Sequence, residues 1–456
     1  MNLTAICWLI LFLGLSCMTF RRSSWGIALY LLTCFAHPPN WWWGAGFLMD
    51  LGIRWNLCAA LIFAAGVALD AKKRWADSEG TAHWVFKFLA IYVINATIVH
   101  YLLASNIDRS FDRLTMLWKQ VGLLLLMWLA MRSKFDFKVL LYSLIVGCCY
   151  IGFEAVVNGR GRFSGARLEG IGIPGAEEAN YLAGLLGLAI PLAGGLLLIG
   201  SRNEKILSFC SLPLILEVIL RCNSRGAFLS LLAGAGWMIG SAKGRIRSMA
   251  ILGVGLGLVA ALLMAKDERI LERFVTTFSE SEDRDKSADA RLAYWSRALM
   301  MIGDYPLGSG AEAAFKSDRG VKYINDIGHY EYRAVHNGYL DIAASWGIQG
   351  ILLFLGAIYI TRRGLRQKLL EMNSVGYLKS GFLGVCIDAA LIVQLSSCIF
   401  ISSLDGEWFY WWMALALGYI RVNALEPIEV LQEDDPERQS RWQTNPSSTT
   451  VLPEAA

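Results

Sequence analysis

Long apolar stretches alternate with short polar loops along most of the chain. Only helices or closed barrels satisfy their backbone hydrogen bonds in lipid, and these stretches lack the alternation of barrel strands. About 20 apolar residues are needed for a helix to cross the hydrocarbon layer. The pattern predicts an all-α polytopic integral membrane protein with 12 or 13 transmembrane helices, the second stretch being short and followed by two prolines. The apolar stretches are 3–20, 23–36, 55–69, 84–104, 115–131, 137–157, 179–200, 206–220, 226–241, 248–265, 338–361, 376–401 and 407–423.

The composition agrees with a membrane location. The 456 residues are 55% hydrophobic and only 18% charged, whereas soluble proteins carry about 25% charged residues. The net charge of +4 comes mostly from the loops on one side and gives no reason to expect a nucleic-acid partner.

The positive charges divide unevenly between the two sides of such a bundle. When the short loops are taken alternately from Arg21 onward, one set holds seventeen Lys and Arg residues and the other holds eight, the large loop 266–335 being left out of the count. The richer side is cytoplasmic in a membrane protein, so the polar stretch 266–335 is expected to face outward. The eight cations in the short outer loops are all arginines, whose planar guanidinium suits phosphate better than an ammonium group does. They are Arg54, Arg109, Arg113, Arg160, Arg162, Arg167, Arg221 and Arg225.

This pattern divides the chain into five regions. They are N-terminal transmembrane helices in 1–157, central transmembrane helices with Arg-rich outer loops in 158–265, a large outer loop in 266–335, C-terminal transmembrane helices in 336–423 and a disordered cytoplasmic tail in 424–456. Within the large loop, helical spacing of apolar residues predicts an amphipathic helix over 288–303, lying on the membrane surface or covering a cavity. Its apolar positions are Leu292, Trp295, Leu299 and Ile302.

The ten cysteines all lie in or at the ends of apolar stretches, and none lies in the large loop. They are expected to be small buried residues rather than disulfides or metal ligands. Neither a metal site nor a cofactor is expected. The loop segment 316–335 contains Tyr323, Tyr330 and Tyr332, which either contact sugars or pack as ordinary interfacial residues.

His336 stands where the polar stretch 266–335 ends and an apolar run begins. An imidazole at the first turn of a helix is biased toward its neutral form by the helix dipole. A neutral imidazole can accept a proton from a hydroxyl group, so His336 is the leading candidate for a catalytic base. The alternative is an interfacial histidine that only bonds to the backbone.

The start of the apolar run at 226 is a candidate anion site. Asn223 or Ser224 can cap that helix, which leaves free N–H groups and the positive dipole end facing outward. Arg225 adds a guanidinium at the same place, although an arginine at the end of a span is also a common membrane anchor. Arg221 is a weaker candidate, because Glu217 lies one helical turn before it and can pair with it.

The remaining candidates lie in three other outward-facing pieces. Arg291 belongs to the expected loop helix, where an arginine commonly just meets solvent. The other candidates are possible substrate-binding residues: Arg160, Arg162, Arg167, Asn180 and Asn337.

Read in order, these pieces resemble the family of bacterial O-antigen ligases and Wzy-type O-antigen polymerases, over roughly 160–361. Each motif is short, but all four occur in order on the side expected to be outside. One departure is the segment before Asn180, where relatives often have proline, so the role of Asn180 stays open. The motifs are Arg162/Gly165/Asn180, Ser224-Arg225-Gly226, Arg291/Trp295/Pro306/Gly308/Gly310 and His336-Asn337.

The resemblance implies a glycosyltransferase in the bacterial inner membrane, multi-pass, with its active site and the 266–335 loop in the periplasm. It would move a glycan from an undecaprenyl pyrophosphate carrier to a lipid or glycan acceptor hydroxyl, as in lipopolysaccharide or surface polysaccharide biosynthesis. Arg225 and Arg291 would neutralise the leaving pyrophosphate in place of a metal ion, and His336 would deprotonate or orient the acceptor. Ligase and polymerase share the donor, and the sequence does not separate them.

The main alternative is a transporter or flippase for a lipid-linked or anionic substrate. Glu154, Glu217 and Asp388 lie within or near the ends of apolar stretches, where ionisable residues are functional candidates. Against it stand the lack of a visible internal repeat, the long outer loop and the purely arginine cations of the short outer loops. A protein that binds the polymer without catalysis is a third reading.

Overall fold

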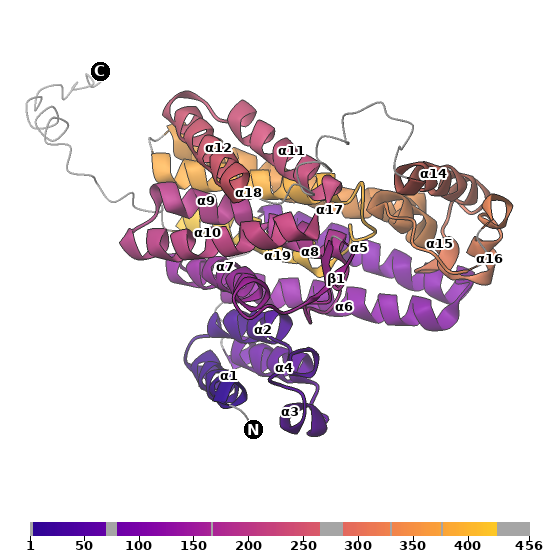
Figure 1. Ribbon diagram of the computed structural model, residues 1–456, viewed down its shortest axis with the longest axis horizontal. Coiled ribbons are helices and arrows are strands. Elements are labelled where there is room, and N and C mark those ends of the chain that lie inside the picture. Colours follow the sequence, from indigo (N-terminus) through magenta and orange to yellow (C-terminus); the bar gives the residue numbers. More distant parts are fainter. Residues whose placement is uncertain are drawn as a thin grey trace, which may run out of the picture.

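The computed structural model describes residues 3–69, 80–165, 167–264, 286–328, 331–374 and 377–425. In these segments the chain is almost entirely helical, with one small antiparallel hairpin, and the helices form a long bundle (Figure 1). In chain order the elements are α1 (Leu3–Arg21), α2 (Trp25–Phe35), η1 (Pro38–Asn40), α3 (Phe47–Asp50), α4 (Trp55–Leu69), α5 (Gly80–Leu103), α6 (Ile107–Ala130), α7 (Lys134–Val156), β1 (Arg162–Ser164), β2 (Arg167–Glu169), α8 (Ala179–Gly187), α9 (Ala189–Ile199), α10 (Arg202–Cys222), α11 (Arg225–Ser241), α12 (Gly244–Met264), α14 (Lys286–Asp304), α15 (Ala313–Lys316), α16 (Asp318–Val321), η4 (Asn325–Ile327), α17 (Gly338–Ser374), α18 (Leu378–Ser397) and α19 (Glu407–Leu425).

Every apolar stretch in the sequence contains helix, which confirms the all-α polytopic class. In the described part of the chain, however, eight helices are long and apolar enough to cross a membrane, fewer than the 12 or 13 predicted. The difference arises partly because α2, α4 and α11 have only 11, 15 and 17 residues, short of the roughly 20 that a span requires. The spanning helices are α1, α5, α6, α7, α8 with α9, α12, α17 and α18.

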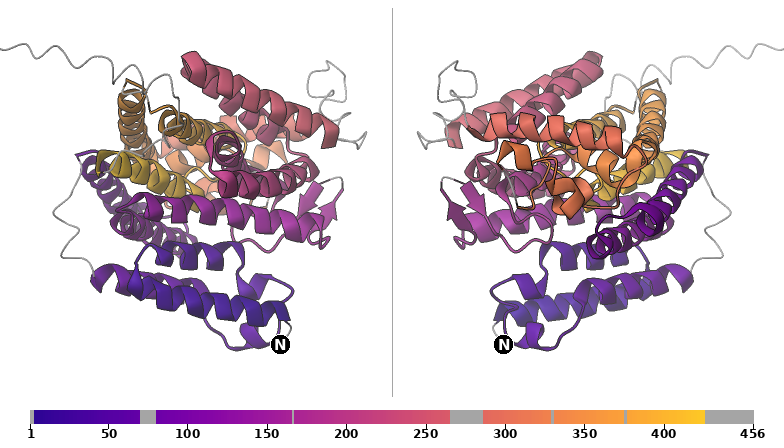
Figure 2. Two further views of the ribbon diagram at one scale, coloured as in Figure 1. Left: turned by 90° about the vertical axis from the view of Figure 1, so that its left-hand side faces the viewer. Right: turned by 90° about the vertical axis from the view of Figure 1, so that its right-hand side faces the viewer.

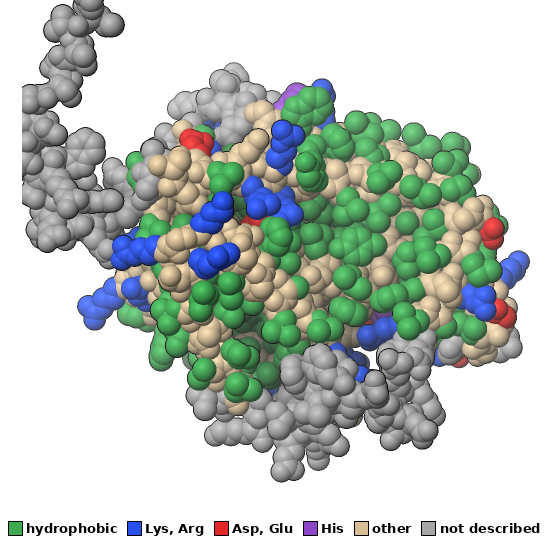
Figure 3. All heavy atoms as spheres, turned by 90° about the horizontal axis from the view of Figure 1, so that it is seen from above, with side chains coloured by type: hydrophobic (Ala, Val, Ile, Leu, Met, Phe, Trp, Pro, Cys, Tyr) green, Lys and Arg blue, Asp and Glu red, His purple; other side chains and the backbone are tan. Residues whose placement is uncertain are grey.

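Two long helices organise the interior. α17 packs against α5, α18 and α19, while α18 also packs against α11 and α9. α18 is the most enclosed of the spanning helices and α12 the least, and the end-on views show α12 on the outside of the bundle (Figure 2). In Figure 3, hydrophobic side chains cover the middle and right of one face and Lys and Arg gather toward its left. A broad apolar surface of this kind is expected of a protein surrounded by lipid.

α14, α15 and α16 lie together at one end of the bundle (Figure 1). The helix predicted over 288–303 is therefore present as α14, and its four apolar positions divide between two faces. Ile302 is buried and Trp295 packs against the same cluster, with Tyr294, Ala298 and Met301, whereas Leu292 and Leu299 are exposed, at 61% and 59%. The reason is that α14 rests on other loop residues and on the first turns of α17, so the tertiary contacts select a face rotated from the most apolar one.

α17 is interrupted inside its apolar run. Gly347, the tenth residue of α17, has φ 82° and ψ 171°, which ends the first helical piece. The segment that follows Tyr305 fills this break with backbone hydrogen bonds. Ser309 N–H donates to Ala344 C=O at 3.0 Å, and Ile348 N–H donates to Pro306 C=O at 2.9 Å. Broken backbone at membrane depth is tolerated when protein groups replace the lost helical bonds in this way.

The two loop glycines of this segment are needed for the close approach. A Cβ on Gly308, at φ 95°, would lie 2.6 Å from the backbone nitrogen of Gly347. A Cβ on Gly310, at φ 87°, would lie 2.7 Å from Ala104 on the neighbouring loop. Both angles also favour glycine. The Pro306/Gly308/Gly310 motif thus holds the large loop in close contact with α17 at its interruption.

Candidate active site

The connection 398–404 between α18 and α19 is a meeting point for helix starts. Gly338 N–H, at the start of α17, donates to Cys398 C=O at 2.8 Å. At the start of α11, a Cβ on Gly226 would lie 2.9 Å from the Phe400 side chain. The positive ends of two helix dipoles therefore meet on either side of this connection, an arrangement that favours an anion.

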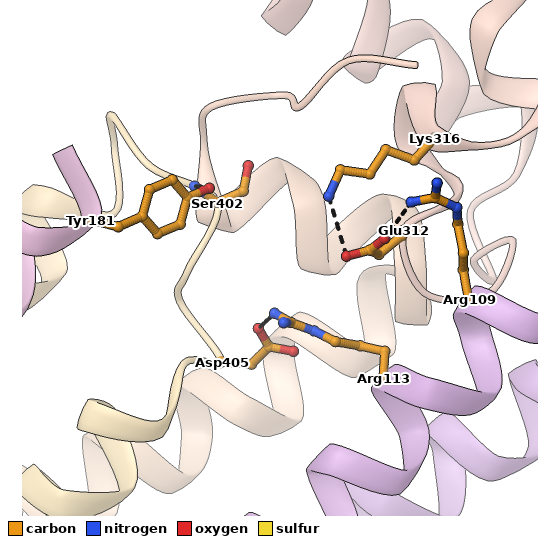
Figure 4. Close-up of polar contacts among 7 residues, drawn as sticks. All are labelled: Arg109, Arg113, Tyr181, Glu312, Lys316, Ser402 and Asp405. Atoms are coloured by element: carbon orange, nitrogen blue, oxygen red, sulfur yellow. Dashed lines mark hydrogen bonds and ion pairs between the residues drawn. The ribbon is translucent and has the colours of Figure 1, made fainter. Parts of the chain in front are cut away.

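A third helix start reaches the same connection. Tyr181, in the first turn of α8, accepts a hydrogen bond through its hydroxyl oxygen from Ser402 N–H at 3.2 Å. The pair is visible at the left of Figure 4. The first turns of α8, α11 and α17, far apart in the sequence, are thereby gathered at one place.

His336 lies directly before the α17 cap. Its φ of 53° is in the left-handed region, which non-glycine residues rarely adopt and which often marks a functional site. Asn337 is the cap itself, since its side-chain oxygen accepts from Tyr339 N–H at 3.0 Å and Leu340 N–H at 3.2 Å. Asn337 is buried and fixes the start of α17; its contact with substrate stays a prediction.

The electrostatic surroundings of His336 are strongly positive. Burial, followed by the charges of Arg291, Lys316, Arg167 and Arg333, lowers the pKa of His336 to about 4. Its Nδ1 is buried and has no hydrogen-bond partner among the described residues. The imidazole is therefore neutral at physiological pH, as expected from the sequence, although burial and nearby cations account for this more than the helix dipole does. A neutral ring with an open nitrogen can accept a proton.

Arg167 and Asn180 form a single polar lock. Arg167 donates to Asn180 Oδ1 and, through Nε, to Cys222 C=O at 3.3 Å. The same Asn180 oxygen accepts from Ser224 Oγ at 2.8 Å, and Ser224 Oγ accepts from Ala227 N–H at 3.3 Å as the cap of α11. These bonds tie the β hairpin and α8 to the start of α11, and the contact of Asn180 with substrate stays a prediction.

Of the other predicted arginines, only Arg225 lies next to the Arg167–Asn180 hydrogen bonds. Arg225 occupies the first turn of α11, next to this lock, and is half-buried. Arg221 pairs with Glu217 at 2.7 Å, the alternative already apparent from the sequence. Arg160 stacks over the Trp42 ring at 4.4 Å and Arg162 is exposed on β1. Among the described residues, no hydrogen bond or ion pair joins Arg160, Arg162 or Arg221 to His336.

Sequence reasoning missed a network of charges beside His336, shown in Figure 4. Glu312 pairs with Lys316 at 3.2 Å and with Arg109 at 3.1 Å, and Arg113 of α6 pairs with Asp405. Burial opposes ionisation of Glu312, but Lys316 and Arg109 outweigh it and hold the pKa of that carboxyl below its ordinary value. Lys316 is thus fixed by an ionised partner while its charge also acts on His336.

Asp341 lies one turn into α17, within electrostatic range of Arg113, Lys316, Asp405 and Glu312. It is an acidic residue in the first turn of an apolar run, which was a signal available in the sequence. Lys316 and Arg333 gave no such signal, because isolated cations in a polar loop usually face solvent. In the described part of the chain, no group of three or more His, Cys, Asp or Glu residues could hold a metal ion.

Comparison with known families gives one match. Residues 210–355 match a family model described as O-antigen ligase. A search of curated proteins found no match to the chain. The matched region contains three of the four motifs recognised in the sequence, including Arg225, Arg291 and His336, and it confirms the predicted resemblance.

Proposed function

Because residues 210–355 match a family model described as O-antigen ligase, we propose that the protein transfers a glycan from a polyprenyl pyrophosphate carrier to an acceptor hydroxyl. The observation that carries the proposal is the neutral, half-buried His336 among the charges of Arg291, Lys316, Arg167 and Arg333. A base and an anion-binding group are the two elements that such a displacement requires.

The reaction assigns one role to each side of the site. The acceptor oxygen forms a bond to the anomeric carbon of the donor glycan as its proton passes to His336 Nδ1 or Nε2. The bond between the anomeric carbon and the phosphate oxygen breaks, and its electron pair leaves with the pyrophosphate. Arg291 and Arg225 stabilise the charge that develops there, because preorganised donors in a site with little water are worth more than they are in water. Arginine cations can do this work without a metal ion.

The low pKa of His336 fits a donor-first order. With the cations unoccupied, protonated His336 is disfavoured and the base is weak. A pyrophosphate bound among the same cations cancels their charge and raises the pKa of the imidazole. His336 then becomes a strong enough base only when the donor is bound, so it does not take a proton from the acceptor or from water in the absence of donor.

The end of the bundle that carries α14–α16 is proposed to face the periplasm of a bacterial inner membrane. The support is the seventeen-to-eight distribution of Lys and Arg between alternate loops. Reporter fusions after Lys316 and after Leu378 are expected to be periplasmic and cytoplasmic, respectively. A Lys316 fusion that is active only in the cytoplasm would invert the site and remove access to a periplasmic acceptor.

The activity is tested by transfer on the purified protein in vesicles, with an undecaprenyl-pyrophosphate-linked glycan and a lipid A-core acceptor. The expected product is glycosylated acceptor with release of undecaprenyl pyrophosphate. Movement of the intact donor across the bilayer without release would identify a flippase instead. In cells lacking the gene, long carrier-linked chains would indicate a ligase and single repeat units a polymerase, while an unchanged carrier pool would overturn the proposal.

A further inference from the structure

A hollow of about 550 Å³ opens on the loop end of the molecule, outside the surroundings of His336. It is lined by the α5–α6 connection on one side and by the ends of α14 and α16 on the other. The lining residues are Ala104, Ser105, Tyr305, Arg319, Lys322 and Tyr323. The lining thus combines two aromatic rings and two cations and includes no carboxylate.

The two rings are held in fixed positions. Tyr323 donates a hydrogen bond from its hydroxyl to Asp304 Oδ2 at 2.6 Å. Burial and this bond raise the pKa of Tyr323 to about 12, so the hydroxyl keeps its proton at neutral pH. Tyr305 stacks against the Arg319 guanidinium, whose central carbon lies 4.6 Å from the ring centre. Rigid aromatic faces with polar edges are suited to the mixed apolar and hydroxylated surface of a sugar ring.

The two cations of this hollow have no acidic partner in the part of the chain that the structure describes. Neither Arg319 nor Lys322 forms an ion pair with a described carboxylate, in contrast with Lys316 and Arg109 nearby. Arg319 is half-buried and is oriented by Tyr305, so its planar fork is preorganised for a carboxylate. Lys322 is exposed at the rim. The hollow therefore places two cations without an ion-pair partner among the described carboxylates beside two aromatic rings, and the Asp304 carboxylate is held at its edge by Tyr323.

We propose that this hollow is a glycan subsite that binds an acidic sugar unit, a hexuronate, of the transferred or receiving chain. Arg319 takes the carboxylate, Lys322 adds charge at the rim, and Tyr305 and Tyr323 contact the ring. The inference rests on the proposed function insofar as it supplies a glycan, and it adds the class of sugar. It gives Tyr323 the sugar-contacting role considered from the sequence. Tyr332 instead bonds to Asp318 at 2.9 Å, and Tyr330 lies outside the described residues.

The position of the hollow suits a chain that extends from the reaction centre. Ser105 on its wall donates a hydrogen bond to Ser317 Oγ at 3.2 Å. Ser317 follows Lys316, whose charge acts on His336. Two neighbouring residues of the loop thus connect the hollow with the surroundings of the imidazole, and a glycan of several units could occupy both places.

The test measures binding to the full-length protein in nanodiscs by calorimetry. The probes are a tetragalacturonate and its carboxyl-reduced counterpart, which has the same length and no charge. The acidic probe is expected to bind at least about tenfold more tightly, and Arg319→Gln should remove about tenfold of its affinity, because hydrogen bonds to charged groups are the stronger ones. Arg363→Gln is the matched control, since Arg363 lines a second hollow at the other end of α17.

Two further variants keep the test decisive. If Arg319→Gln does not fold, Lys322→Gln replaces an exposed side chain and should still weaken the acidic probe. His336→Asn should bind the probe normally, so a failure of transfer and a failure of this subsite are separable. Equal binding of the two probes, or inorganic phosphate competing at Arg319 as tightly as the uronate binds, would overturn the proposal.

Discussion

His336→Asn is expected to lower the transfer rate by about 10²–10⁴, the usual contribution of a positioned general base. Asparagine is chosen because it tolerates the left-handed φ of 53° at this position, whereas alanine would add backbone strain. The amide cannot accept the proton from the acceptor, so chemistry is lost while the α17 cap at Asn337 remains. Donor binding should change little, because the cations around the ring are untouched.

The matched control for this variant is His83→Asn, the same substitution at an exposed histidine near the start of α5. It should leave the rate unchanged. A rate for His336→Asn within a few fold of the unmodified protein would show that the imidazole is not the base. Weakened donor binding with an intact rate of the bound complex would make His336 a binding residue only.

The pH dependence of the same reaction follows from the pKa of His336. Since this pKa lies at about 4 in the free protein, below its ordinary value, the neutral base is present above about pH 5. The rate at low donor concentration reports the free enzyme and should stay level from pH 8 down to about pH 5 before it falls. At saturating donor the fall should begin at a higher pH, because bound pyrophosphate raises the pKa. A rate that rises as pH falls would exclude the base.

The helices, and the position of His336 before one of them, could be predicted because both depend on local sequence. Apolar runs of sufficient length form helices in lipid whatever surrounds them, and the shift from polar to apolar residues at 336 marked the helix start. The break at Gly347 could not be predicted in the same way. A glycine inside an apolar run is compatible with an unbroken helix, and only the contacts with 306–310 reveal the break.

The surroundings of His336 were predicted only in part for a related reason. Arg291 was selected by its motif, but Lys316 and Arg333 approach the imidazole through the tertiary fold of the loop, which has no periodic signature. The apolar spacing predicted the helix α14 but not which of its sides is buried, because Leu292 and Leu299 are exposed while the smaller Ala298 packs in the cluster that includes the first turns of α17. Local hydrophobicity does not contain that information.

Arg291→Lys is expected to lower the transfer rate roughly a hundredfold, the cost of losing one preorganised donor to a developing charge, about 3 kcal/mol. Lysine keeps the charge and loses the planar fork that grips two phosphate oxygens. Arg225→Lys should behave similarly, since Arg225 stands at the helix start beside the Asn180 lock. Arg297→Lys is the control on the same helix, because Arg297 pairs with Asp326 at 2.5 Å and should tolerate lysine.

A second substitution separates charge from geometry at Arg291. Its positive charge is the largest charge effect that lowers the pKa of His336, so Arg291→Gln should raise that pKa, whereas Arg291→Lys should leave it nearly unchanged. The acid limb measured at low donor concentration should therefore move toward neutral pH in Arg291→Gln and stay in place in Arg291→Lys, while both variants lose rate. Two results would show that Arg291 is a surface residue of α14 and not part of the reaction centre. One is near-normal turnover in Arg291→Lys. The other is an acid-side fall in rate that occurs at the same pH in Arg291→Gln as in the unmodified protein.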